Sequence, residues 1–168
     1  FLKEILDQHK ASALKEWIHF GLTSQDINNT AIPLSWKNAM ESEILPAYIN
    51  LQNRLYQFAK QWKKVPLLAR THGQSASPTT LGKEIMVFVE RINHQIELFS
   101  SIPYAAKFGG ATGNYNAHHI AYPKKNWVSL GNEFVDDVLG LERMQFTTQI
   151  EHYDHFAAHC DNLKRLNT

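Results

Sequence analysis

The sequence predicts an all-α fold, a bundle of long helices, and three observations support this prediction. Apolar residues recur at helical spacing in most segments, prolines and polar runs separate these segments, and no stretch shows the alternation of a half-buried strand. Each amphipathic helix must bury its apolar face against another element, so long helices joined by polar loops favour a helical bundle.

The first half of the chain is expected to contain two helical regions. Helical spacing marks residues 2–18 as the first, and a polar loop over 21–29 follows. Proline opens the second region, residues 33–62, and Pro46 inside it should kink or split the helix because proline has no N–H to donate. Residues 65–69 are expected to form an extended link.

A third long helix is expected to begin at Pro78, since proline is favoured in a first helical turn. Its apolar residues form a seam whose spacing is close to a heptad, which is typical of helices that pack nearly parallel. This seam could meet helices of partner subunits or of the same chain. The seam consists of Leu81, Ile85, Val89, Ile92, Ile96 and Phe99.

The remaining stretch is expected to contain a loop and two helices. A glycine-rich loop, 109–113, interrupts the helical pattern. Pro123 then opens a helix that Gly140 ends, because glycine readily adopts the backbone conformation found after a helix. The last helix should begin near Glu151.

Composition and charge exclude several classes of protein. A net charge of +1 provides no basic field for nucleic acid, and no apolar stretch approaches the roughly 20 residues that span a bilayer. A single cysteine, Cys160, excludes an internal disulfide and indicates a reducing, cytoplasmic compartment. Helical patterns at both ends suggest a fragment of a longer protein.

The run from Ala69 to Glu84 is dense in small polar side chains and is the strongest candidate site. His72 can carry a proton near neutral pH and release it, while Thr71 and Gln74 could orient a ligand. The plainer interpretation is a structural histidine.

Three further segments carry candidate residues, each with a plainer interpretation. Thr23 and Ser24 begin a polar run, 23–31, that suits either helix capping or the binding of an anion by hydroxyls and exposed backbone N–H groups. The glycine-rich segment 107–118 is not a phosphate loop, since no Gly-Lys-Ser/Thr follows, and a plain connector is equally consistent. Residues 147–152 suit a helix cap.

A metal site is a further alternative. His152, His155 and His159 fall on one face of the last predicted helix, and three imidazoles could bind a metal ion. No separate fourth ligand is identifiable, so we predict no metal.

Taken together, four segments in this order resemble the adenylosuccinate lyase family of the fumarase/aspartase superfamily. The resemblance covers essentially the whole chain, and it rests on residues 23–31, 70–74 with 78–83, 114–118 and 147–151. The superfamily's signature loop with its catalytic serine base is absent, as is the family's upstream histidine segment. His152 and Tyr153 stand where many relatives have Pro-His.

The resemblance implies a carbon–nitrogen lyase of purine and AMP biosynthesis. Such an enzyme removes fumarate from adenylosuccinate, which gives AMP, and from the succinylated aminoimidazole carboxamide ribotide, without a cofactor. By the same resemblance His72 is the catalytic acid, and Thr23, Ser24, Thr71 and Gln149 bind the substrate. Without the serine base, residues 1–168 are expected to be inactive alone.

The resemblance also implies an assembly and a domain organisation. Family members are homotetramers whose active sites draw on three subunits, with a small succinylated purine nucleotide as substrate and no nucleic-acid or membrane partner. Residues 1–22 would end the N-terminal helical domain, and 23–168 would be part of the central helical-bundle domain, truncated at its C-terminal end.

Two alternatives stay open. One is a noncatalytic helical module that binds metal through its three clustered histidines. The other is another lyase of the superfamily, such as argininosuccinate lyase or a crystallin-type descendant. The patterns Thr-Ser-x-Asp and Pro-Thr-Thr-x-Gly-Lys favour the adenylosuccinate branch.

Overall fold

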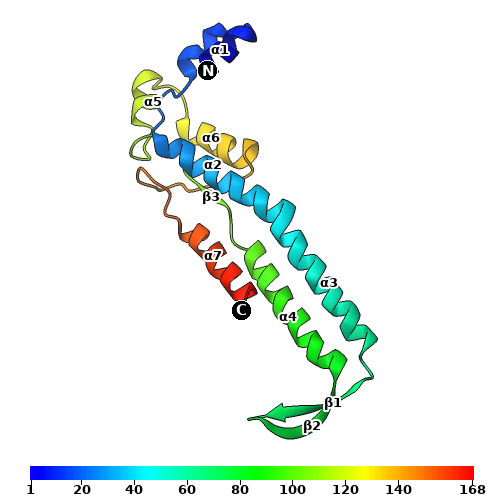
Figure 1. The fold of residues 1–168 in the computed structure, drawn as a ribbon. Helices are drawn as coiled ribbons and strands as arrows, with labels where there is room; N and C mark the ends of the chain where they lie inside the picture. Colours follow the sequence, from blue (N-terminus) through cyan, green and yellow to red (C-terminus); the bar gives the residue numbers. More distant parts are fainter. The chain divides into compact units, whose positions relative to one another are not determined.

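The computed structural model describes all residues from 1 to 168 and is predominantly helical, which confirms the predicted fold class (Figure 1). The chain divides into two compact units. The first unit combines residues 1–35 with 103–156, and the second combines 36–102 with 157–168. The expected domain boundary after residue 22 concerns a longer protein and stays a prediction.

The first unit is built from short elements and the beginnings of two longer helices. Its small sheet pairs β3 and β4 in parallel. The elements are α1 (Leu2–Gln8), the 3-10 helix η1 (Ser12–Trp17), the start of α2 (Ser24–Ala39), β3 (Ala105–Ala106), α5 (Asn116–Ala121), α6 (Trp127–Asn132), the π-helix η3 (Glu133–Val138), β4 (Glu142–Arg143) and the start of α7 (Asp154–Leu166).

The apolar core of the first unit lies around β3 and η3. Ala106, Val135 and Leu141 are buried at its centre. Partly buried apolar side chains pack around them, namely Leu34, Tyr104, Phe108, Phe134 and Leu139.

The second unit is dominated by two long helices joined by a β-hairpin. The end of α2 continues through the π-helix η2 (Met40–Ile44) into α3 (Leu45–Gln61), and β1 (Pro66–Thr71), β2 (Gln74–Thr80) and α4 (Leu81–Ser100) follow. α3 and α4 lie side by side (Figure 1). The end of α7 joins α4 through hydrogen bonds to Gln95.

None of the three prolines predicted to open helices does so. Pro33 lies inside α2, which begins at Ser24. A proline at this position leaves the carbonyl of Asn29 without its helical donor, and the backbone N–H of Lys107 donates to that carbonyl instead, at 3.2 Å. Pro46 lies in the first turn of α3, directly after the π-helical turn.

The β-hairpin is the main feature that the sequence pattern missed. Pro78, the second of these prolines, lies in β2 and pairs with Leu68 of β1 rather than opening a helix. α4 begins at Leu81 and is capped by Thr80, whose hydroxyl accepts from the backbone N–H of Lys83 at 3.3 Å. Most hairpin residues are exposed, so the hairpin shows no apolar alternation.

Several boundaries in the second half also differ from the prediction. The helix expected at Pro123 begins at Trp127, capped by the Asn126 side chain. The last helix begins at Asp154 rather than near Glu151. Gly140 follows η3 with a φ of +62°, as the predicted helix end requires.

The apolar seam of α4 is buried or half-buried within the second unit. Gln52 of α3 donates to Asn93 of α4 at 2.9 Å, and the ring of Phe99 stacks on that of His159, with centroids 4.5 Å apart. The seam therefore packs inside the chain. None of the helices combines the length and the apolar content that crossing a membrane requires.

Candidate active site

The predicted site residues are divided between the two units. Thr23, Ser24 and Gln149 belong to the first unit, and Thr71 and His72 belong to the second. Each group is held by its own surroundings.

The group in the first unit lies at the beginning of α2. Thr23 directly precedes this helix, and its backbone N–H donates to a carboxylate oxygen of Asp26 at 2.9 Å. This bond is half of a capping box, in which a side chain three positions on satisfies the cap residue. The Gln149 amide donates to the Thr23 hydroxyl at 3.4 Å, so two predicted substrate-binding residues are in contact. Ser24 is exposed beside them.

The carboxylate of Asp26 is the centre of this arrangement. One oxygen accepts from Nζ of Lys107 at 2.7 Å and from the backbone N–H of Gly109 at 2.9 Å. The other accepts from Gly110 at 3.1 Å as well as from Thr23. Both charged side chains are completely buried. A buried ion pair with this many donors is the kind that can be retained in a protein interior.

The charge state of Asp26 follows from these contacts. Burial alone would raise the pKa of this carboxyl group, because it disfavours the charged form. Hydrogen bonds from Lys107, Thr23 and Gly109 outweigh burial, so the pKa lies below its ordinary value of 3.8. Asp26 is therefore ionised at neutral pH.

The glycine-rich loop connects this carboxylate to the segment that carries Gln149. A Cβ atom on Gly113 would lie 2.5 Å from the carbonyl oxygen of Thr147 and 3.0 Å from that of Thr148. Only glycine permits such a close approach of two backbones. The loop is thus more than a plain connector, because it supports the segment that leads to Gln149.

A second set of hydrogen bonds fixes the chain after Gln149. The Asn29 side chain in α2 accepts from the backbone N–H of Glu151 at 2.9 Å and donates to the hydroxyl of Tyr153. The Glu151 carboxylate accepts in turn from the backbone N–H of Tyr153. The predicted cap segment is therefore attached to α2.

A buried histidine lies next to the same loop. His118 is 2 % exposed, and its ring contacts those of Phe20, Tyr115 and Trp127. Burial lowers its pKa below the ordinary value of 6.5, although the charge of Asp26 acts in the opposite direction. The imidazole is therefore neutral at pH 7.

The group in the second unit lies at the tip of the β-hairpin. Thr71 pairs with Gln74, which leaves His72 and Gly73 as a two-residue turn with φ of +49° and +75°. Two positive φ values identify a type I′ turn, which joins tightly twisted strands. His72 is exposed at the tip of the hairpin, and its role in catalysis stays a prediction.

Two of the three histidines of the metal-binding alternative have other partners. Nδ1 of His159 accepts from Trp36 at 3.3 Å, and its Nε2 lies 3.1 Å from the carbonyl of Ile102. Nε2 of His152 lies 2.9 Å from the carbonyl of Phe146. No group of histidine, cysteine or acidic side chains is arranged to hold a metal ion, and the structure therefore does not support this alternative.

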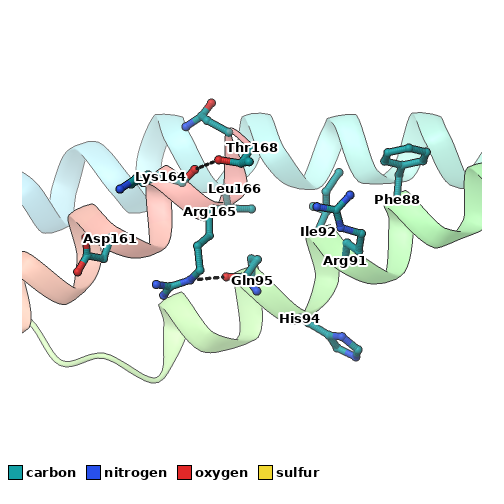
Figure 2. A pocket seen from close by; sticks show the side chains of 11 residues that line it. Phe88, Arg91, Ile92, His94, Gln95, Asp161, Lys164, Arg165, Leu166 and Thr168 are labelled. Carbon is teal, nitrogen blue, oxygen red and sulfur yellow. Dashed lines mark hydrogen bonds between the residues drawn. The ribbon is translucent and has the colours of Figure 1, made fainter. Parts of the chain in front are cut away.

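A pocket of about 790 Å³ lies in the second unit, between α4 and α7. Figure 2 shows the side chains that line it. Basic side chains line it, among them Arg91, Lys164 and Arg165, and Arg165 donates to Gln95 at 3.1 Å. None of the predicted site residues lines this pocket.

Sequence reasoning missed Asp26, Lys107 and Asn29 as organising residues of the candidate site. One signal could have revealed the pair. Lys107 is a lone charge in the run 104–110, which otherwise holds apolar residues, a tyrosine and glycines, and a buried lysine requires a carboxylate.

Comparison with known proteins places these observations in a family. Proteins named adenylosuccinate lyase match the entire chain, with 53% identity over 173 residues for Dictyostelium discoideum. Those of Vibrio cholerae and Escherichia coli K12 are each 41% identical over 169 residues. The chain spans 37% of the length of these relatives. A family model described as "Lyase" matches residues 1–168, and the chain therefore belongs to this lyase family.

Proposed function

We propose that the protein carrying this chain is an adenylosuccinate lyase, which eliminates fumarate from adenylosuccinate and from the succinylated aminoimidazole carboxamide ribotide. The observation that carries the proposal is the 53% and 41% identity to proteins of that name along the whole chain. The substrate would be a small succinylated purine nucleotide. The single, exposed cysteine is consistent with a cytoplasmic location.

The proposed reaction needs a base, an acid and groups that hold the dicarboxylate. A base removes a proton from the carbon next to a carboxylate, and negative charge develops on that carboxylate while the acid protonates the departing nitrogen. Fixed hydrogen-bond donors can stabilise this charge without a metal or an organic cofactor. The serine base of the family would belong to the part of the protein outside residues 1–168.

The residues of this chain would divide the remaining roles between them. His72 would protonate the leaving nitrogen, since its imidazole is exposed at the tip of the hairpin. Thr23 and Ser24 would hold a carboxylate of the succinyl group at the beginning of α2, where hydroxyls and the helix dipole favour an anion. Gln149 would orient the substrate, and Thr71 would contact it beside His72.

We also propose that the protein is a homotetramer whose active sites combine residues from different subunits. Exposed apolar side chains on the second unit support an assembly. On α4, Met86 is 39% exposed, Val87 42% and Phe88 52%, although the apolar seam of the same helix packs inside the chain. Contiguous exposed apolar surface is typical of protein–protein contacts.

The test is an assay of fumarate release by the full-length protein. Adenylosuccinate is the substrate, and argininosuccinate in a parallel reaction tests the alternative lyase. We expect fumarate from adenylosuccinate only. Release from argininosuccinate alone would favour the other branch of the superfamily, and release from neither would contradict the proposed function.

A further inference from the structure

We propose that Asp26, together with Lys107, is a positioning residue that sets the two substrate-binding side chains Thr23 and Gln149. This inference rests on the proposed function, because it takes those two residues as substrate-binding. It adds a pair of residues that would not touch the substrate and would act through the side chains that bind it.

The contacts of Asp26 reach both substrate-binding residues by separate routes. The first route is direct, since Asp26 accepts the backbone N–H of Thr23 at 2.9 Å and the Thr23 hydroxyl accepts from Gln149 at 3.4 Å. The second passes through the glycine-rich loop. Asp26 accepts from Gly109 and Gly110, and Gly113 of the same loop lies against the backbone just before Gln149.

Lys107 makes this geometry stable by neutralising the buried carboxylate. Its ammonium group donates to Asp26 and to the carbonyl of Gly110, and its backbone N–H donates to the carbonyl of Asn29 in α2. The lysine thus bonds to both the loop and the helix that the carboxylate connects. It is 0% exposed, as is Asp26.

A purely structural role is the competing explanation. Buried ion pairs are weak evidence for stability, because a well-packed apolar pair of similar volume often stabilises a protein as well or better. What an apolar pair cannot do is accept three backbone N–H groups and thereby fix a loop against a helix start. The two explanations therefore differ in whether substrate affinity depends on the pair.

The first experiment separates affinity from stability. In the full-length enzyme, the double variant Asp26→Asn/Lys107→Met removes both charges without leaving one buried alone. We expect its KM for adenylosuccinate to rise at least about tenfold, while kcat changes less, because a ligand-binding contact acts in the ground state and transition state alike. Assays should be run at a temperature where both enzymes are folded by circular dichroism.

The matched control is Val135→Ala in the core of the same unit. Val135 is fully buried, and its apolar side chain contributes no hydrogen bond to the contacts of Asp26, so its truncation lowers the melting temperature without removing a contact of Thr23 or Gln149. We expect an unchanged KM for this variant. A KM of Asp26→Asn/Lys107→Met equal to that of the control would overturn the proposal.

A double-mutant cycle with Thr23 tests whether Asp26 acts through it. Thr23→Val should raise KM in the wild-type background, and it should raise KM much less when Asp26 is already replaced, because Thr23 is then misplaced. Additive effects would overturn the positioning role. If the double variant does not fold, Asp26→Glu replaces it in the cycle, because this substitution keeps the charge but lengthens the side chain.

Failure of this inference is distinguishable from failure of the proposed function. If the wild-type full-length protein releases no fumarate from adenylosuccinate, the proposed function fails and the positioning role with it. If the wild type is active and the pair can be replaced without a change in KM, only the positioning role fails.

Discussion

Among single residues, His118 links the stability of the fold to pH, because burial lowers the pKa of its imidazole. It is buried, and its pKa in the folded protein is below the ordinary value of 6.5. As the pH falls below about 6.5, the unfolded chain therefore binds a proton that the folded chain resists, and the free energy of unfolding must decrease. This loss continues down to the lower, folded-state pKa.

Urea unfolding at pH 7.5, 6.5 and 5.5 measures this effect. We expect the midpoint to fall toward pH 5.5 in the wild type and to fall less in His118→Gln, which cannot be protonated. An identical pH dependence in both proteins would show that His118 is not the group responsible.

Single residues also show which contacts could be predicted from the sequence and which could not. Thr23 and Gln149 were identified by family resemblance, and the structure brings them into contact. Asp26 and Lys107 were missed because each is unremarkable in its own segment, and only the fold brings them 2.7 Å apart across a separation of 81 residues. Local spacing predicts faces of helices but not such long-range pairs.

At the scale of elements, the β-hairpin depends on the turn formed by His72 and Gly73. Gly73 has a φ of +75°, and a Cβ atom there would meet nothing within 4 Å. Gly73→Ala should therefore destabilise the hairpin through backbone strain alone, by about 1 kcal/mol. Gly73→Asn is the matched control, since asparagine tolerates positive φ better than alanine does.

Hydrogen exchange of the backbone amides in β1 and β2 reports on this hairpin directly. About 1 kcal/mol corresponds to roughly fivefold faster exchange in Gly73→Ala. A smaller increase is expected in Gly73→Asn. Unchanged exchange in the alanine variant would mean that the turn does not hold the hairpin together.

The elements were predictable where burial follows a helical period. α3 and α4 bury one face against each other and were recognised in outline, although both predicted proline starts were wrong. The hairpin was missed because its side chains are mostly exposed and leave no apolar alternation. α5, only Asn116–Ala121, was missed because so short a helix carries no period.

At the scale of the whole molecule, the proposed homotetramer explains why the second unit exposes apolar side chains. A charge on such a surface is costly when a partner covers it and harmless when it faces water. Phe88→Glu should therefore shift the full-length protein toward smaller species. Gln57→Glu introduces the same charge at an exposed polar position of α3 and should not.

Sedimentation velocity distinguishes these outcomes. A tetramer in the wild type and in Gln57→Glu, with smaller species in Phe88→Glu, would support an interface on this face of α4. If Phe88→Glu remained tetrameric, the interface would have to lie elsewhere, and a monomeric wild type would contradict the proposed assembly.

In the proposed reaction, the His72 imidazole at the tip of the hairpin donates a proton to the nitrogen that leaves during fumarate elimination. The most direct measurement is the turnover of adenylosuccinate by full-length His72→Ala, with His94→Ala as a control because it removes another exposed histidine. We expect turnover to be slower by about 10²- to 10⁴-fold in His72→Ala and unchanged in His94→Ala. Turnover of His72→Ala close to that of the wild type would contradict it.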